Sequence, residues 1–112
     1  MEAMLQALAD PRRREIVEIL LEKEQLVGDL ARRLPIAQSG VSRHLRILKD
    51  AGMVESRTEG QRRIYSLRPE PFEKLSEWLA QYRRLWESRL DKFEIELAGR
   101  TPALKAKKRR AR

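Results

Sequence analysis

Apolar residues recur at helical spacing through the first half of the chain and predict four short helices. We expect them at residues 1–9, 11–21, 27–34 and 38–50. Asp10 followed by Pro11 suits the start of the second helix, because aspartate caps helices and proline fits the first helical position. Pro35 ends the third, since the residue before a proline is driven out of helical conformation. Only two or three residues then separate the third helix from the fourth, which predicts a helix-turn-helix.

The fourth helix lies within "SGVSRHLRILKDAG" and has two contrasting faces. Val41, Leu45 and Leu48 follow helical spacing and form an apolar face, and Gly52 closes the helix. The opposite face offers hydroxyls and arginines, with no acid before Asp50. Its members are Ser39, Ser42, Arg43 and Arg46. An ordinary exposed helix mixes acids with bases, so this composition predicts a binding surface.

A β-hairpin is predicted directly after this helix. "MVESRT" and "QRRIYSL" alternate as strands do, and Glu59-Gly60 between them suits a tight turn. A hairpin that follows a helix-turn-helix is a wing, here at residues 53–67. Its strands carry three basic side chains, Arg57, Arg62 and Arg63.

The apolar pattern of residues 69–97 predicts one long helix. Its apolar positions include Phe72, Leu75, Leu79, Tyr82 and Trp86. Such a helix exposes more apolar surface than one small domain can cover, which predicts contact with another chain. Residues 99–112 form a low-complexity basic tail that we expect to be disordered. The domain is therefore expected over 1–98, with dimerisation helices at about 1–9 and 70–98.

The net charge of +8 divides unevenly along the chain. Residues 32–68 carry nine basic and three acidic side chains, a net charge of +6, whereas residues 99–112 carry seven basic side chains and no acidic one. The segments 1–31 and 69–98 are mildly negative. Clustered positive charge favours a polyanion through release of counterions. The tail supports only non-specific affinity, so any specific contact with a nucleic acid has to come from the middle segment.

The composition also excludes several classes of site. The chain has no cysteine and a single histidine, His44, so it cannot form a structural zinc site or a cysteine nucleophile. It has no glycine-rich phosphate loop and no nucleophile with a matching base, and we expect no catalytic residue, no metal, no cofactor and no enzymatic activity. No apolar run approaches the ~20 residues that span a bilayer, and no signal-peptide pattern opens the chain. We therefore expect a soluble intracellular protein without a membrane partner.

In a helix-turn-helix the second helix enters the major groove of double-stranded DNA, where its outer side chains reach base edges. Arg43 is the best candidate for a bidentate contact with guanine, with a phosphate contact as the alternative, and Gln38 could pair with adenine. Ser39 and Ser42 suit phosphates or bases, and Arg46 suits the backbone. The wing arginines, Arg57, Arg62 and Arg63, suit phosphates or the minor groove, unless the hairpin is only a solvated surface.

Two stretches, "LADPRRREIVEILL" and "LVGDLARRLPIAQSGVSRHLRILKDAGMVESRTEGQRRIYSL", resemble the arsenic-repressor (ArsR-type) winged-helix family over about residues 3–68. The resemblance implies a small bacterial homodimeric repressor of its own or neighbouring genes, which binds operator DNA and releases it on a signal. It implies a cytoplasmic protein that joins the nucleoid when bound. The family dimerises through its first and last helices, and the matching apolar positions are Leu5, Leu8, Phe72, Leu75, Leu79, Tyr82 and Trp86.

The sequence departs from the metal-sensing members of that family. They resemble "ELCVCDL" in the third helix, where this chain has "EQLVGDL", so Leu26 and Gly28 replace the thiolates. Other members use histidines in the last helix, and residues 72–97 contain none. The resemblance therefore implies a metal-independent subgroup. Ala37 also stands where a capping serine is common, which predicts a weakly held start of the fourth helix.

These patterns together predict a mainly α protein with a small β-hairpin, a winged helix-turn-helix followed by a long dimerisation helix. A two-fold dimer would bind an inverted-repeat operator through helix 38–50 and wing 53–67. A small-molecule inducer is possible, but no residue identifies it. Two alternatives stay open: a protein-interaction module, and an architectural protein that binds all duplexes alike.

Overall fold

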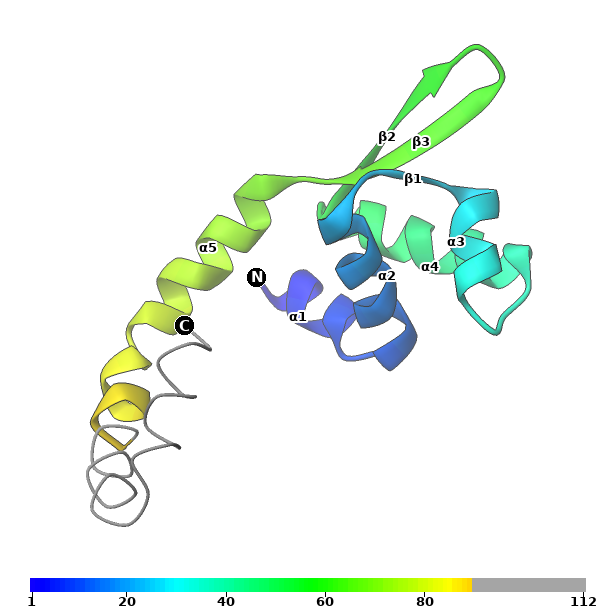
Figure 1. Ribbon diagram of the computed structural model, residues 1–112. Helices are drawn as coiled ribbons and strands as arrows, with labels where there is room; N and C mark the ends of the chain where they lie inside the picture. Colours follow the sequence, from blue (N-terminus) through cyan, green and yellow to red (C-terminus); the bar gives the residue numbers. More distant parts are fainter. Residues whose placement is uncertain (90–112) are drawn as a thin grey trace, which may run out of the picture. The chain divides into compact units, whose positions relative to one another are not determined.

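The computed structural model describes residues 1–89. Within residues 1–75, short helices lie beside a small sheet from which a hairpin projects (Figure 1). The elements are α1 (Glu2–Leu8), α2 (Pro11–Glu22), β1 (Gln25–Leu26), α3 (Val27–Arg33), α4 (Gln38–Asp50), β2 (Val54–Glu59), β3 (Arg62–Leu67) and α5 (Pro69–Ala80). The four predicted helices before Gly52 are thus present within one residue of their expected bounds. The chain divides into two compact units, Met1–Leu75 and a second that begins at Ser76.

The start of α2 confirms the predicted cap. The Asp10 carboxylate accepts hydrogen bonds from the backbone N–H groups of Arg12 at 2.7 Å and Arg13 at 3.3 Å. Partial desolvation acts to raise the pKa of this carboxyl, but those two N–H donors and the Arg13 charge outweigh it and lower the pKa. Because the cap accepts two otherwise unpaired donors, it fixes where α2 begins.

Two arginines of α2 complete the end of α1, an arrangement that the sequence pattern did not indicate. Arg13 Nε donates to the carbonyl oxygen of Ala7 at 2.7 Å, and Arg14 Nη1 donates to that of Leu8 at 2.7 Å. The last carbonyls of a helix have no partner within it, and cationic donors also match the negative end of its dipole. The run of arginines after Pro11 therefore joins α1 to α2 and does not form an open basic patch.

The core lies beneath α4. Val41, Leu45 and Leu48 have no exposed surface, as the apolar pattern predicted. They pack in one cluster with buried side chains of α1, α2, α3 and the start of the wing, or of residues next to these elements, namely Met4, Ala7, Ile16, Ile19, Leu20, Leu30, Leu34, Met53 and Val54. This burial fixes the rotation of α4 about its axis, so the opposite face has to point outward.

A Schellman motif ends α4 at Gly52, which confirms the predicted stop. Gly52 has a φ of +78°, a value that suits glycine. Its N–H donates to the carbonyl oxygen of Lys49 at 2.9 Å, and the N–H of Met53 donates to that of Leu48 at 3.0 Å. The chain thereby turns directly from α4 into the wing.

The start of α4 is less well held, as predicted. Ala37 occupies the cap position with an extended backbone and offers no side-chain acceptor to the first N–H groups. We expect Ala37→Ser to raise the free energy of unfolding by about 0.5–1 kcal/mol, because a serine hydroxyl supplies the missing acceptor. Urea denaturation followed by circular dichroism measures this change. Ala37→Val offers no acceptor and is the control; an equal gain in stability from valine would contradict the explanation.

The sheet has three strands in the order β1-β3-β2, one more than predicted. Gln25 pairs with Tyr65 and Leu26 with Ile64, so the two-residue β1 lies antiparallel to β3. The hairpin register pairs Glu59 with Arg62, which leaves Gly60 and Gln61 as the loop, one residue later than predicted. Gly60 has a φ of +64°, as the first position of a type II′ turn requires.

The prediction of one continuous helix over 69–97 was wrong within the described residues. Helix α5 ends at Ala80, and residues 83–89 are helical again after a turn at Gln81 and Tyr82. At this turn the N–H of Tyr82 donates to the carbonyl oxygen of Leu79 at 2.9 Å, a bond to the third residue back instead of the fourth. Such bonds tighten the helix locally. The rest of the predicted helix and the tail 99–112 lie outside the described residues.

Candidate nucleic-acid interface

The outward face of α4 presents every side chain of this helix that the sequence assigned to base or backbone contacts. Those side chains are Gln38, Ser39, Ser42, Arg43 and Arg46, and all five are exposed. They lie on the side opposite the completely buried Val41 and Leu45. The face is therefore held in one orientation by the core while its polar groups remain accessible.

The two arginines on this face keep their donors for an outside partner. Among residues 1–89, neither Arg43 nor Arg46 forms an ion pair or a side-chain hydrogen bond. A guanidinium presents five donors in a planar fork that matches the two acceptors of guanine or the oxygens of a phosphate. These side chains can thus bind a duplex without first breaking a contact within the described part of the chain.

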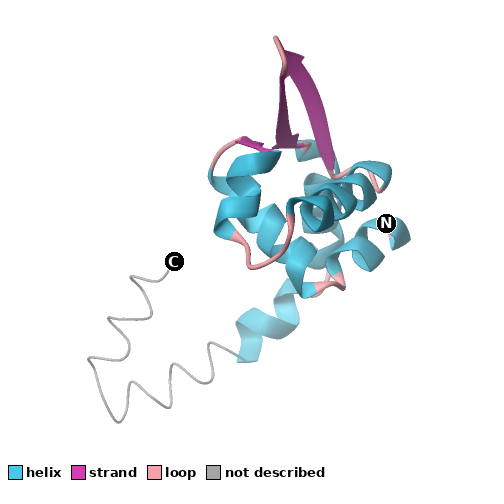
Figure 2. Cartoon of the chain, turned by 90° about the vertical axis from the view of Figure 1, so that its right-hand side faces the viewer, coloured by secondary structure: helices cyan, strands magenta, loops and turns pink. Residues whose placement is uncertain are grey.

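The wing projects away from the helices (Figure 2). Arg62 and Arg63 are both exposed near its tip, and the register places Arg62 opposite Glu59 and Arg63 opposite Thr58. Because directly opposite residues share a face and successive residues alternate, these two arginines lie on opposite faces of the hairpin. Of these two arginines, only Arg63 lies opposite an uncharged residue in the ladder.

Arg57 differs from the other wing arginines, because its guanidinium forms ion pairs with two carboxylates of its own chain. Its Nη1 and Nη2 donate to the two carboxylate oxygens of Glu24 at 2.5 and 2.6 Å, and its Nε donates to Glu59 at 3.3 Å. The Glu24 hydrogen bonds raise the pKa of Arg57, and the same bonds lower the pKa of Glu24 against a smaller effect of desolvation. In the structure Arg57 therefore ties the wing to Glu24, and its role as a DNA contact stays a prediction.

Lys49 is a functional candidate that the sequence pattern missed. It is exposed on α4, one turn beyond Arg46, and its Nζ donates to the Ser56 hydroxyl at 3.0 Å. This bond joins the exposed end of α4 to β2. Its helical spacing from Arg46 was visible in the sequence, but the position of Ser56 required the fold. Lys49 thereby helps to keep the helix and the wing in a fixed relation.

These contacts predict different effects for two wing substitutions. We expect Arg63→Ala to weaken binding to cognate and scrambled duplexes alike and to reduce the slope of log K against log salt by about 1, as removal of a phosphate contact does. Arg57→Ala should leave that slope unchanged, because Glu24 already neutralises this guanidinium. Fluorescence anisotropy at several salt concentrations measures both. A larger slope change for Arg57→Ala than for Arg63→Ala would contradict these roles.

The predicted dimer positions fall into two groups. Leu8, Phe72 and Leu75 are half-buried against the core of their own chain, so part of their apolar surface is already used. The others are exposed: Leu5 in α1, and Leu79, Tyr82 and Trp86 in the second unit. Trp78 and Leu85 are also exposed in that unit, although neither is among the named dimer positions. Trp78 packs edge-on against Tyr82, with ring centroids 5.4 Å apart.

Residues 1–89 contain no group of three or more histidine, cysteine, aspartate or glutamate side chains that could hold a metal ion. Among the helices of this part, none is long and apolar enough to cross a membrane.

Comparison with known proteins gives a consistent result. Residues 10–56 match the model of the arsR family of bacterial regulatory proteins. The HTH-type transcriptional regulator Rv2034 of Mycobacterium tuberculosis is 52% identical over 57% of this chain and 60% of its own length. The transcriptional repressor SdpR of Bacillus subtilis is 30% identical over 73% of this chain and 91% of its own length.

The fold is shared with solved structures. The crystal structure of an ArsR family transcriptional regulator superposes with a TM-score of 0.68 and 32% identity, over 77% of this chain and 94% of the other. The chain spans about 60% of the length of Rv2034. The matched residues 10–56 include all of α4, on which the candidate interface lies.

Proposed function

We propose that this chain, which belongs to the arsR family of bacterial regulatory proteins, binds operator DNA as a homodimer through α4 and the wing. The observation that carries the proposal is the outward face of α4. Arg43 and Arg46 are exposed there and have no acidic partner among the described residues. The opposite, apolar face of the helix is completely buried. Members of this family are regulatory proteins and not enzymes, in agreement with the absence of catalytic motifs from the sequence.

In this proposal α4 enters the major groove, and Arg43 and Gln38 contact base edges. Ser39, Ser42 and Arg46 bind the backbone or neighbouring bases. The wing adds Arg62 and Arg63 at phosphates or in the minor groove. Since two copies related by a two-fold axis present the same helix twice, the operator is an inverted repeat.

Dimerisation is proposed from the exposed apolar side chains of the second unit and of α1. Trp86 and Leu85 are 66% and 65% exposed. Such exposure is high for large apolar side chains that lie close together, and it marks a surface that contacts another chain. We expect Trp86→Ala to weaken the dimer at least tenfold, because large aromatic side chains dominate interface energies. Sedimentation equilibrium measures this.

Leu21 provides the control for that substitution. It is 75% exposed but lies at the end of α2, outside the predicted interface. Leu21→Ala should leave dimerisation unchanged. If Trp86→Ala dimerises as tightly as Leu21→Ala, the proposed interface is wrong.

Deletion of residues 100–112 separates the proposal from its two rivals. The truncated chain should keep a strong preference for its operator over scrambled DNA and lose non-specific affinity, because seven basic side chains belong to residues 99–112 and the proposal assigns no base contact to them. A protein-interaction module predicts no preference for the operator, and loss of most of the non-specific DNA affinity with the tail. An architectural protein predicts equal binding to both duplexes before and after truncation.

Several finer assignments belong to the same proposal. The domain covers 1–98, and 99–112 is a basic tail. Regulation is repression of its own or neighbouring genes, although an activator would present the same DNA-binding face. The protein acts in the bacterial cytoplasm, on the nucleoid when bound. Leu26 and Gly28 replace the two thiolates of the metal-sensing pattern, which supports a metal-independent signal.

A further inference from the structure

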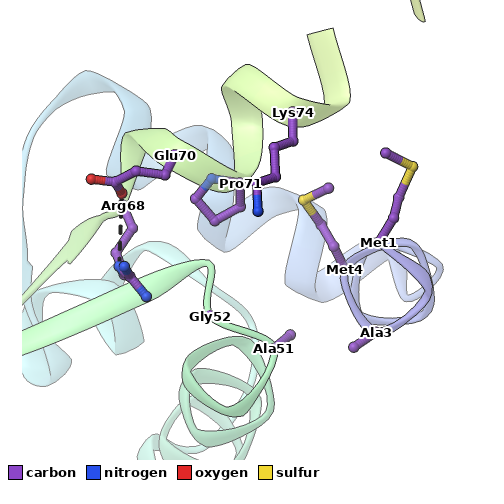
Figure 3. Close-up of a pocket in the computed structure, with 9 residues that line it drawn as sticks. All are labelled: Met1, Ala3, Met4, Ala51, Gly52, Arg68, Glu70, Pro71 and Lys74. Atoms are coloured by element: carbon purple, nitrogen blue, oxygen red, sulfur yellow. Dashed lines mark ion pairs between the residues drawn. The ribbon is translucent and has the colours of Figure 1, made fainter. Parts of the chain in front are cut away.

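A cavity of about 260 Å³ lies within the first unit, beside the end of α4 (Figure 3). Its walls come from α1, from the turn that follows α4, and from the first residues of α5. The charged part of the lining consists of Arg68, Glu70 and Lys74. The apolar part consists of Met1, Ala3, Met4, Ala51 and Pro71. The cavity is separate from the outward face of α4, which points away from the core.

The charged lining has more positive than negative groups. Arg68 Nε lies 3.8 Å from Glu70 Oε2, a distance typical of a loose ion pair and too long for a hydrogen bond. Lys74 has no ion pair or side-chain hydrogen bond with another residue in the range 1–89. Its side chain passes Pro71 and ends on the side that faces the Gly52 turn (Figure 3). Two cations with spare donors therefore border one cavity.

The position of Arg68 connects this cavity to the DNA-binding elements. Its backbone N–H donates to the carbonyl oxygen of Met53 at 2.9 Å, which ties the end of β3 to the turn after α4. Its Nη1 lies 3.9 Å from the point where a side chain on Gly52 would begin, so the guanidinium packs over that turn. A ligand that binds Arg68 would contact the structure from which both α4 and the wing continue.

We propose that this cavity binds a small organic anion with an apolar body. The anion would accept hydrogen bonds from Arg68 and Lys74 while its apolar part packs against Met4, Ala51 and Pro71. The volume is just below the range of about 300–1,000 Å³ that is usual for small-molecule pockets, so the ligand is smaller than a drug-sized molecule. Resting on the function proposed above, occupation of the cavity changes the affinity of α4 and the wing for DNA.

Octanoate is a suitable probe, because it joins one carboxylate to a short apolar chain. Titration of the full-length protein is followed through the ¹³C-labelled methionine methyl signals. Of the chain's three methionines, Met1 and Met4 line the cavity, whereas Met53 is fully buried in the core and does not line it. Saturable movement of the Met4 signal is expected, with octanoate binding about tenfold tighter than uncharged octanol, since the alcohol cannot form a charge-assisted hydrogen bond.

Matched variants test the assignment of the cations. Lys74→Gln and Arg68→Gln should each weaken octanoate binding about fivefold or more, and Ala3→Leu should weaken it by filling the cavity while both charges remain. Lys23→Gln removes the same charge from the end of α2 and should have no effect. Absence of saturation, equal affinity for octanol, or equal binding by the Lys74 and Lys23 variants would overturn the proposed site.

The link to DNA is tested separately, so that the two proposals can fail independently. Saturating octanoate should change the affinity for an inverted-repeat duplex at least threefold, and the duplex should change the octanoate affinity by the same factor, as linkage requires. Saturable octanoate binding without any change in DNA affinity would overturn the regulatory role alone. Absence of any sequence preference in DNA binding would instead contradict the proposed function and leave the octanoate result standing.

Discussion

Leu45→Ala is expected to lower the free energy of unfolding by about 2–5 kcal/mol, the range found when a buried leucine is truncated. Leu45 has no exposed surface and lies at the centre of the apolar face of α4. Its removal leaves a cavity among Val41, Leu48 and the helices beneath, which a close-packed interior cannot fill fully. Chemical denaturation measures this decrease.

Leu21→Ala provides the comparison for this decrease in stability. Leu21 is 75% exposed, so its truncation should change the free energy of unfolding by less than about 0.5 kcal/mol. DNA affinity, measured where the Leu45 variant is still folded, should also fall, because the orientation of α4 depends on its buried face. Similar small effects for Leu45→Ala and Leu21→Ala would mean that α4 is not anchored as the structure describes.

Arg43→Ala is expected to weaken binding to the cognate operator by about 1–3 kcal/mol in each half-site, and to affect random DNA much less. The reason is that a bidentate contact to guanine exists only on the right sequence, whereas a phosphate contact exists on every duplex. Electrophoretic mobility shift or anisotropy with both duplexes at one salt concentration measures the difference. Equal decreases in affinity on the two duplexes would make Arg43 a phosphate contact.

Arg43→Lys gives a sharper version of the same test. Lysine keeps the positive charge but lacks the planar fork of the guanidinium, so it serves a phosphate better than a bidentate base contact. We expect Arg43→Lys to reduce the specificity nearly as much as Arg43→Ala does. Arg46, which is assigned to the backbone, should tolerate lysine with little change on either duplex.

The elements that support the interface could be predicted from the sequence because their signals are local. Asp10 and Pro11 are adjacent, and the cap they predict is present. The apolar spacing of α4 predicted which side chains are buried, and hence which are exposed. Gly52 ended the helix because a positive φ is accessible to glycine. Each of these predictions depends on a few neighbouring residues and on backbone geometry.

Other features depend on contacts between distant parts of the chain, and no local pattern marks them. The strand β1 has two residues, too few to show an alternation, and exists because β3 pairs with it. The sequence marked Arg57 as a third basic contact on the wing. In the structure its two terminal nitrogens, Nη1 and Nη2, donate to Glu24, which lies 33 residues earlier in the chain. The pairing of these two side chains follows from the place of β2 in the sheet.

The C-terminal part was predicted least well. The apolar pattern continues smoothly through residues 80–83, and neither proline nor glycine marks the turn at Gln81 and Tyr82. Spacing by seven also emphasised Leu79 and Trp86 and passed over the exposed Leu85. A periodic pattern identifies the apolar face of a helix. It does not reveal where backbone hydrogen bonds change from the fourth residue back to the third residue back.

The central claim, that the outward face of α4 recognises a DNA sequence, is tested most directly by selection of duplexes from a random library with the full-length protein. Repeated rounds should recover an inverted repeat, and the recovered site should bind at least about 10³-fold more tightly than its scrambled version at the same salt concentration. Arg43→Ala should remove a large part of that ratio. Recovery of no common sequence, or equal affinities for the recovered and scrambled duplexes, would contradict the claim.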